Sequence, residues 1–471
     1  MMHRWTKTLG LALFASAGTA LAQAPPASQG PRTVPGSGSS LPRACSELPG
    51  VDLVDVGGAG SRVTSATQAS DRGVAVCAVE GVLAPSIGFK LLLPLQAWTG
   101  RYLQVGCGGL CGRASLEVGA ADGCVPLAAG GFVIASTDMG HQGMGGEFGQ
   151  DPHKREDFAH RGVHLTAVAS KKLVSAFYGR DAAHAYFTGC SDGGREALVE
   201  AQRHPEDFDG IVAGAPAMNF QVQNSLYHAW QARSNTGADG KAILAASRLP
   251  LLHRAALDQC DGLDGQVDGL IVDPRACRFD PGALLCRSNP PEDGASCLTP
   301  AEVEAVRRLY HGPRDAATGE RLTIGGPQPG SELAWAGVFV PRAADQPIFS
   351  ERIALDALRN LVFESNPPAG FGLNDLRFDR ATFDRLRPLH ALYDATDPDL
   401  SAFAGKGGKL ILWHGWSDPH ISPINTIAYH EAVERSLGRQ RTESFDRLYL
   451  LPGVYHCSGG EGPAASTCSH P

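Results

Sequence analysis

Short apolar runs alternate with amphipathic stretches over much of the chain. Apolar runs of four to eight residues predict buried β-strands, and apolar positions with a period of 3.6 predict helices. The clearest helical pattern covers about 163–178, with Val168, Leu173 and Phe177 among its apolar positions. This alternation predicts an α/β fold built on a parallel sheet. The expected strands are 90–94, 102–105, 131–135, 185–188, 210–213, 409–413 and 447–451.

The alternation stops near Phe220 and resumes at about Lys409. The block between them is rich in Pro and Gly and contains four of the cysteines. A long block of this kind inside an α/β fold predicts an inserted domain above the carboxyl ends of the strands, where open α/β sheets bind ligands. We therefore expect an α/β core of residues 44–220 and 401–471 and an inserted lid of residues 221–400.

The N-terminal segment has the pattern of a secretory signal peptide. A positively charged start precedes the apolar run 9–17, and Ala20-Leu21-Ala22 offers a cleavage site. The alternative, an N-terminal anchor, conflicts with an apolar run too short to span a bilayer. We expect a signal peptide over 1–22, a Pro-, Gly- and Ser-rich flexible linker over 23–43, and a secreted or periplasmic protein without membrane attachment.

Composition narrows the functional classes. The 471 residues are 43% hydrophobic and 19% charged, which is ordinary for a globular protein. The net charge of −8 and the lack of a basic run give nucleic-acid binding little electrostatic support. The 12 cysteines are an even number, and in an exported protein disulfides are their expected state.

A candidate nucleophile lies in residues 186–198, YFTGCSDGGREAL. Gly189, Ser191 and Gly193 form a Gly-x-Ser-x-Gly motif between a predicted strand and a predicted helix, which is the setting of a nucleophile elbow. Small residues flank the serine, as such a tight turn requires. The alternative is a helix N-cap serine in a glycine-rich turn.

A serine nucleophile needs a base, and the base needs an acid that orients it. In α/β-hydrolases these follow the serine in the order Asp or Glu, then His. Asp418 follows the predicted strand 409–413, and His456 follows the strand 447–451. His430 and His470 are competitors, but the first lies in a predicted helix and the second in the terminal tail.

Ester hydrolysis also needs backbone N–H donors for the oxyanion. One donor should be the N–H of Asp192, directly after the nucleophile, and the other should come from the loop after an early strand. The loop 106–110 follows the strand 102–105 and offers Gly108 or Gly109. The alternative is a plain glycine-rich turn.

Two cysteines flank the candidate nucleophile and base. Cys190 precedes Ser191, and Cys457 follows His456. If Ser191 and His456 come within about 3 Å of each other, the neighbouring Cα atoms could fall within disulfide reach, about 4.4–6.8 Å. The alternative is two unrelated structural cysteines.

Together, Gly-Cys-Ser-Asp-Gly-Gly-Arg-Glu, His-Gly-Trp-Ser-Asp and Tyr-His-Cys resemble the motifs of the tannase/feruloyl esterase family. The resemblance extends from about Cys45 to Cys457. It implies an α/β-hydrolase core with an inserted lid, a Ser191–Asp418–His456 triad and a Cys190–Cys457 disulfide. It also implies that His414, four residues before Asp418, lines the substrate pocket.

A cation site is expected in the lid. Asp261, Asp264 and Asp268 lie in one short loop, and carboxylates this close repel one another unless a cation neutralises them. Oxygen ligands suit Ca²⁺. The loop resembles the structural calcium loop of this family, in which the backbone carbonyls of Gln266 and Leu270 would also bind the ion. The alternative is a solvated acidic turn, and no organic cofactor is expected.

The remaining cysteines suggest further bridges. We expect the pairs Cys260–Cys277 and Cys286–Cys297 in the lid and Cys45–Cys77 in the core. The pairing of four cysteines stays open: Cys107, Cys111, Cys124 and Cys468.

The function expected from these features is a secreted serine esterase for small esters of aromatic acids. An arginine that binds a free carboxylate would instead favour a mono(2-hydroxyethyl) terephthalate hydrolase, although no arginine can be assigned that role. A secreted serine peptidase and a non-catalytic binding protein on the same fold are the alternatives from other classes. The candidate aromatic walls of the pocket are Phe220, Tyr227, Trp230, Trp335, Phe339 and Phe371, although most of them are expected in the core of the lid instead.

Overall fold

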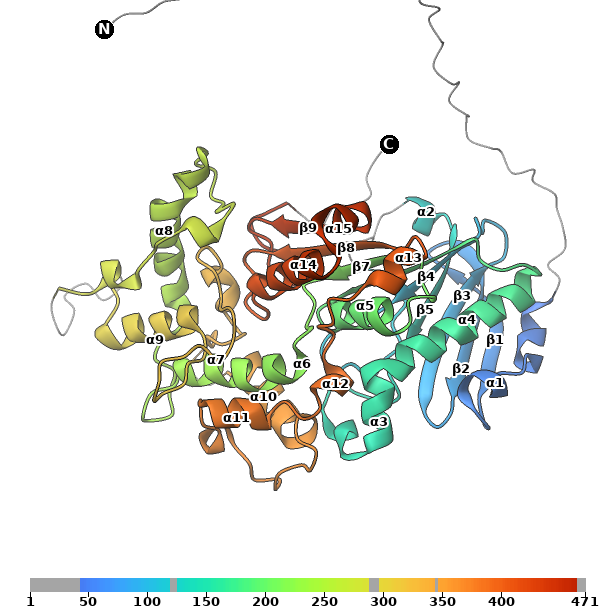
Figure 1. Cartoon of the computed structure of the whole chain (residues 1–471), viewed down its shortest axis with the longest axis horizontal. Helices are drawn as coiled ribbons and strands as arrows, with labels where there is room; N and C mark the ends of the chain where they lie inside the picture. Colours follow the sequence, from blue (N-terminus) through green and yellow to red (C-terminus); the bar gives the residue numbers. More distant parts are fainter. Residues whose placement is uncertain (1–42, 119–124, 288–295, 344–345, 464–471) are drawn as a thin grey trace, which may run out of the picture. The chain divides into compact units, whose positions relative to one another are not determined.

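The computed structural model describes residues 43–118, 125–287, 296–343 and 346–463. The described residues form a nine-stranded sheet in the order β1-β2-β3-β5-β4-β6-β7-β8-β9 (Figure 1). The α/β class expected from the sequence is confirmed. The strands are β1 (Arg62–Asp71), β2 (Val74–Leu83), β3 (Ile87–Pro94), β4 (Arg101–Val105), β5 (Phe132–Thr137), β6 (His184–Cys190), β7 (Gly210–Gly214), β8 (Lys409–Gly415) and β9 (Asp446–Leu451).

The sheet is parallel from β5 to β9 and antiparallel from β1 to β3 and on to β5. The prediction of a parallel strand at 90–94 is therefore wrong, because β3 runs antiparallel to both β2 and β5. The sequence pattern also missed the hairpin of β1 and β2. Its two-residue turn, Arg72-Gly73, has positive φ at both residues (48° and 84°), as in the type I′ turns that favour hairpins.

Three long helices pack on the sheet. The predicted helix at 163–178 is α4 (Gly162–Tyr178), which contacts β3 and β5. The helix α5 (Asp192–Arg203) contacts β6 and β7, and α14 (Pro423–Leu437) contacts β8 and β9. The other helices outside the 221–400 segment are α1 (Val54–Gly57), α2 (Val125–Ala128), α3 (Pro152–Glu156), α13 (Ser401–Gly405) and α15 (Arg439–Phe445), and α6 (Phe220–Val222) lies at the start of the segment.

In its described residues the segment 221–400 contributes helices and turns and no strand to the sheet. In Figure 1 these helices, light green to orange, lie to the left of and below the sheet. No described helix is both long and apolar enough to cross a membrane. The helices of this segment are α7 (His228–Ser234), α8 (Leu249–Cys260), α9 (Pro300–His311), α10 (Phe349–Asn360), α11 (Arg380–Arg385) and α12 (His390–Tyr393).

The larger hydrophobic side chains of the inserted segment fall into two main groups, beside a small cluster of Cys260, Ile271 and Cys277. Residues from Leu244 to Val340 form a cluster of their own around Trp335 and Phe339. Residues after about 350, such as Ile353 and Leu358, belong instead to the large cluster that includes the sheet. The later part of the insertion is thus packed into the core of the molecule.

Candidate active site

Ser191 lies at the sharp turn between the end of β6 and the start of α5. Its φ of 66° and ψ of −120° are strained for a residue with a side chain, at a cost of roughly 1–3 kcal/mol. Its N–H donates to Gly214 O (3.0 Å), and its carbonyl accepts the N–H of Ala217 (2.9 Å). A Cβ at Gly189 would lie 2.3 Å from Gly193 O, so the tight turn requires glycine there. The structure therefore has the predicted elbow.

Asp418 and His456 are brought together from the loops after β8 and β9. His456 Nδ1 lies 2.7 Å from Asp418 Oδ2. Asp418 is fully buried, and its Oδ1 accepts the N–H groups of His420 (2.8 Å) and Ile421 (3.0 Å). Burial opposes the charge on Asp418, but the nearby His456 and the hydrogen bonds from His414 and His456 hold its pKa below the usual value. Asp418 is therefore an ionised acceptor for His456.

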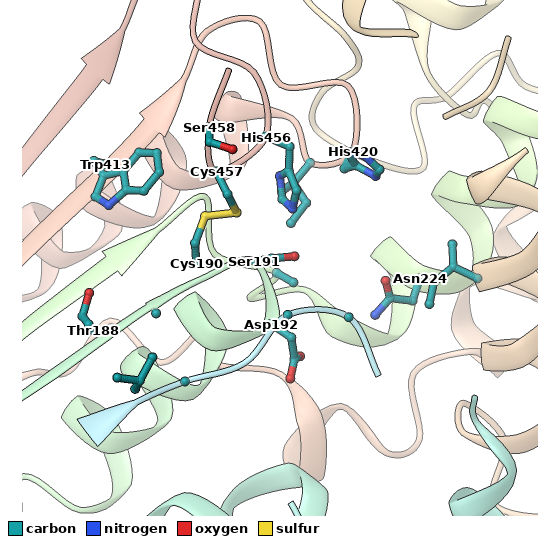
Figure 2. Close-up of a pocket in the computed structure, with 18 of the residues that line it drawn as sticks. Thr188, Cys190, Ser191, Asp192, Asn224, Trp413, His420, His456, Cys457 and Ser458 are labelled. Carbon is teal, nitrogen blue, oxygen red and sulfur yellow. A yellow bond between two sulfur atoms is a disulfide. The ribbon is translucent and has the colours of Figure 1, made fainter. Parts of the chain in front are cut away.

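A disulfide joins the neighbours of Ser191 and His456. Cys190 is bonded to Cys457, with their Cα atoms 5.9 Å apart. Figure 2 shows this bond beside Ser191 and His456, which both line one cavity. In the described part of the chain no hydrogen bond joins Ser191 Oγ to His456; such bonds often tighten only when substrate is bound.

The predicted oxyanion donors lie beside Ser191. Asp192 is the first residue of α5, and Gly108 lies near enough that a Cβ there would be 3.9 Å from Ser191 Cβ. Gly109, at φ 69°, faces Met144 instead, so Gly108 is the better placed of the two candidates. A Cys107–Cys111 disulfide closes this loop, which resolves one pairing that the sequence left open.

The cavity has a volume of about 860 Å³ and lies between the core and the inserted segment. The core contributes Ser191 and His456, and the insertion contributes Asn224, His228 and Phe349. Figure 2 shows Asn224 on the side of the cavity opposite Trp413. None of the six aromatic residues named as candidate walls is among the described residues that line it.

Two neutral histidines contribute to the wall near His456. The ring of His420 lies 4.7 Å from the ring of His456 and 4.6 Å from that of Phe349. Burial, and then the charge of His456, lower the pKa of His420 well below its usual value. Burial likewise lowers the pKa of His228 to about 3. No motif marks these residues, but His420 could have been considered because it lies two positions after Asp418.

His414 does not have the expected position on the pocket wall. It is fully buried, and its Nε2 faces Asp418 Oδ2 (3.0 Å) and Ile421 O (3.1 Å). Two acceptors require the proton on Nε2, so Nδ1 accepts the hydroxyl of Thr426 (2.7 Å). His414 lies behind Asp418 because it ends a buried strand, and it supports that carboxylate.

The three carboxylates of the acidic loop 261–270 do not converge on one point in this conformation. Asp261 is buried, and its oxygens accept the N–H groups of Asp268 (3.2 Å) and Gly269 (2.9 Å). Asp264 and Asp268 accept the N–H groups of Gln266 and Leu270 in the same way. Among the described residues these three side chains do not place ligand oxygens within 4.8 Å of one another. The fit to a calcium ion is thus incomplete.

The other three predicted disulfides are present. They are Cys45–Cys77, Cys260–Cys277 and Cys286–Cys297. Cys124 and Cys468, whose pairing the sequence left open, lie outside the described residues.

Comparison with known proteins identifies the family of this chain. The family model for tannase and feruloyl esterase matches residues 72–468. An uncharacterized esterase from Xanthomonas campestris is 34% identical over 427 residues, covering 83% of this chain and 71% of that protein. Mono(2-hydroxyethyl) terephthalate hydrolase from Piscinibacter sakaiensis is 31% identical, covering 82% and 74%.

A solved structure is similar over most of the chain. The crystal structure of feruloyl esterase B from Aspergillus oryzae superposes with a TM-score of 0.75 at 28% identity, covering 89% of this chain and 84% of that one. The chain belongs to the tannase and feruloyl esterase family and is a carboxylic ester hydrolase.

Proposed function

We propose that this protein is a secreted serine esterase for esters of aromatic acids, with Ser191, His456 and Asp418 as its triad. The observation that carries the proposal is the 2.7 Å contact of His456 Nδ1 with an ionised Asp418, beside a disulfide that ties His456 to Ser191. His456 Nδ1 donates to the carboxylate, so Nε2 is left to accept the proton of Ser191.

Catalysis would proceed through an acyl-enzyme. Ser191 Oγ attacks the ester carbonyl as His456 takes its proton, and the N–H groups of Asp192 and Gly108 stabilise the oxyanion. His456 then protonates the departing alcohol. Water, deprotonated by the same histidine, releases the acid and restores Ser191. Asp418 stays ionised and stabilises the imidazolium.

The cavity favours a neutral aromatic acyl group. Phe349 and Ile353 offer apolar surface, while Asn224 and the two neutral histidines offer hydrogen bonds suited to phenolic hydroxyls. Glu117, which also lines the cavity, would repel a free carboxylate. Phenolic esters such as ferulates or gallates are thus preferred over a terephthalate monoester, despite the relative that bears that activity in its name.

The test is a hydrolysis panel of methyl ferulate, methyl gallate, chlorogenate and mono(2-hydroxyethyl) terephthalate. Wild-type protein should hydrolyse at least one phenolic ester, and Ser191→Ala should lose turnover by about 10⁶-fold with the fold intact by circular dichroism. Ser444→Ala, on the exposed surface, is the matched control. Unchanged turnover in Ser191→Ala would exclude the proposed nucleophile.

We further propose that the protein is exported. The five disulfides among the described residues support folding in an oxidising compartment. Expression in a bacterial host should yield a periplasmic or secreted product whose N-terminus is Gln23. A cytoplasmic product that retains residues 1–22 would contradict export.

Calcium remains a proposal for the loop 261–270, supported by its three carboxylates and by the Cys260–Cys277 bridge around it. Binding would require Asp261, Asp264 and Asp268 to leave their N–H partners and turn toward one point. We expect one calcium per chain by mass spectrometry of the metal content after desalting, and none in Asp261→Ala. Metal-free wild-type protein would exclude the site.

A further inference from the structure

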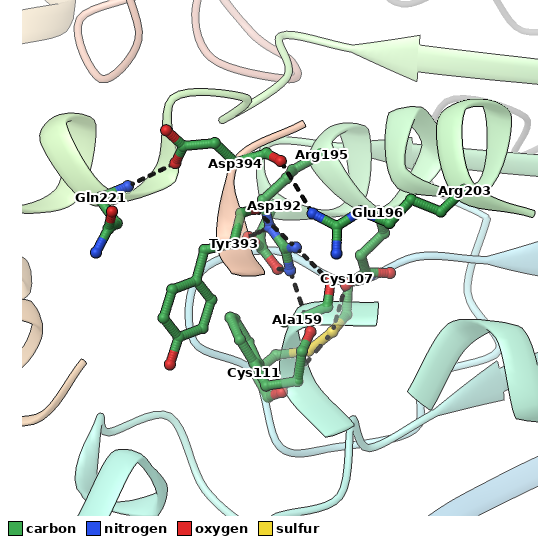
Figure 3. Close-up of polar contacts among 11 residues, drawn as sticks. Cys107, Cys111, Ala159, Asp192, Arg195, Glu196, Arg203, Gln221, Tyr393 and Asp394 are labelled. Atoms are coloured by element: carbon green, nitrogen blue, oxygen red, sulfur yellow. Dashed lines mark hydrogen bonds and ion pairs between the residues drawn. A yellow bond between two sulfur atoms is a disulfide. The ribbon is translucent and has the colours of Figure 1, made fainter. Parts of the chain in front are cut away.

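A group of buried ionisable side chains lies at the start of α5, directly after Ser191; Figure 3 shows their contacts. Asp192, Arg195 and Glu196 are each at most 2% exposed. Arg195 binds Asp192 through two contacts, Nε to Oδ1 at 2.6 Å and Nη2 to Oδ2 at 3.0 Å. Arg195 also donates to the carbonyls of Ala159 (2.8 Å) and Phe158 (3.2 Å). Asp192 is therefore a fixed, paired carboxylate.

Glu196 connects this pair with the oxyanion loop. The N–H of Cys107, the residue before Gly108, points at both oxygens of Glu196 (3.3 and 3.4 Å). On its other side Glu196 lies close to the carboxyl group of Asp192, one turn earlier on α5. The loop leaves no spare room here, since a Cβ at Gly106 would lie 2.7 Å from Glu196 Oε2. One side chain thus touches the segments that carry both proposed oxyanion donors.

Two buried carboxyl groups this close together hold one proton between them, because two adjacent negative charges would repel each other. Asp192 is engaged by the Arg195 guanidinium, so the proton belongs on Glu196. Burial, and then the charge of Asp192, raise the pKa of Glu196 well above its usual value, against smaller opposing effects of Arg195 and the Cys107 N–H. Other ionisable groups near this pair are Glu200 and His141.

We propose that Glu196, as the neutral acid, is a positioning residue that fixes the two sides of the oxyanion hole relative to each other. Its O–H donates to Asp192, and its carbonyl oxygen accepts the N–H of Cys107. Ionisation of Glu196 places two carboxylates in contact and breaks the link. The inference rests on the proposed function, because it assigns the oxyanion donors to Asp192 and Gly108.

Three variants test the proposal. Glu196→Gln keeps a donor toward Asp192 and an acceptor for Cys107 but cannot ionise. Glu196→Met keeps the volume and removes both bonds. Glu200→Gln is the matched control, since Glu200 is equally buried on α5 and also has a pKa raised well above its usual value, chiefly by burial. It has no hydrogen bond to the oxyanion loop among the described residues.

The readouts are kcat on a phenolic methyl ester and the rate of fluorophosphonate labelling of Ser191, each from pH 6 to 10. Wild type and Glu200→Gln should lose both rates at the alkaline end, while Glu196→Gln keeps them. Glu196→Met should lose kcat by about 10–100-fold at every pH with KM little changed, because the loss is in the transition state. Circular dichroism at each pH confirms that the fold is intact.

Failure of the inference is separable from failure of the proposed function. If wild type labels and turns over but Glu196→Gln has the same alkaline decline, Glu196 has no positioning role. The same conclusion follows if a folded Glu196→Met keeps the wild-type kcat. If wild type neither hydrolyses the ester nor reacts with the fluorophosphonate, the proposed function itself fails, and the inference with it.

Discussion

At the scale of single residues, the hydrogen bonds of Asp418 fix the geometry of the site. Its Oδ2 faces both His456 (2.7 Å) and His414 (3.0 Å), and its Oδ1 is held by two backbone N–H groups. Both oxygens of the Asp418 carboxylate are thus held by hydrogen bonds, which fix the orientation of the side chain. The orientation of His456 therefore depends on His414, which is not itself among the described residues that line the cavity.

Replacing His414 should separate positioning from substrate contact. His414→Asn removes the Nε2–H bond to Asp418, so we expect kcat to fall by about 10–100-fold through misplacement of His456. KM should stay within twofold, because the side chain lies behind the carboxylate. Steady-state kinetics on one phenolic ester measures both. A rise in KM with unchanged kcat would instead place His414 against the substrate, as the sequence had suggested.

A second residue-scale prediction concerns pH and stability. Burial raises the pKa of Asp394 to about 6, although its Oδ1 accepts the N–H of Gln221 (3.1 Å). The folded state holds this proton more tightly than the unfolded state. The contribution of Asp394 to the free energy of unfolding is therefore largest below about pH 4, falls as the pH rises from about 4 to 6, and is constant above.

Asp394→Asn lacks this titration. Relative to wild type, its free energy of unfolding should improve by up to about 3 kcal/mol between pH 4 and 7, from 1.36 kcal/mol per pKa unit. Urea unfolding at several pH values measures the difference, with the exposed Asp239→Asn as control. If the difference in the free energy of unfolding does not change with pH, Asp394 is already ionised in the folded protein over this range.

The sequence predicted the residues at strand ends better than those on the lid. Ser191, Asp418 and His456 each follow a strand, and the carboxyl ends of parallel strands meet at one edge. Asn224 and His228 reach the cavity only because inserted helices fold over that edge. No local pattern encodes such a contact, so the sequence could not identify them.

At the scale of elements, the Cys190–Cys457 bridge joins the β6–α5 turn to the loop after β9. It closes a sequence separation of 267 residues, against 11 for Cys286–Cys297. Longer loops give a disulfide more effect on the unfolded chain, on the order of 5 against 3 kcal/mol in the chain-entropy model. Only the first bridge lies between the proposed nucleophile and base.

Removing the two bridges separately should therefore have different effects. The double variant Cys190→Ala/Cys457→Ala should lose stability and also kcat, by about tenfold or more, as Ser191 and His456 gain freedom. Cys286→Ala/Cys297→Ala should lose stability alone. Kinetics at a temperature where both remain folded decides the matter. Equal kcat in the two variants would mean that the Cys190–Cys457 bridge contributes to stability and not to catalysis.

The elements that the sequence missed have a physical explanation. The strand β1 reads Arg-Val-Thr-Ser-Ala-Thr-Gln-Ala-Ser-Asp and is an edge strand with few buried positions, so it lacks the apolar run that predicted the others. In contrast, β3 has the apolar run, but strand direction is set by its hairpin connection to β2, which apolar content does not report.

At the scale of the whole molecule, the two hydrophobic clusters divide the insertion. The outer cluster, residues Leu244–Val340 around Trp335 and Phe339, is separate from the cluster that contains the sheet. The cavity takes Asn224 and His228 from before the outer cluster and Ile353 from after it, while Phe349 packs against both clusters. The outer cluster can therefore be weakened while most walls of the site stay packed on the main cluster.

Phe339→Ala tests this division, with Phe403→Ala as its counterpart in the main cluster; both side chains are fully buried. Each truncation should cost about 3–5 kcal/mol. In Phe339→Ala, hydrogen exchange should accelerate in α8 and α9 but not in α4 and α5. Turnover of a small phenolic ester should persist, because the cavity walls other than Phe349 do not pack against the outer cluster. Phe403→Ala should accelerate exchange in α4 and α5. Uniform acceleration throughout the molecule in Phe339→Ala would mean that both clusters unfold as one cooperative unit, and that the site depends on the outer one after all.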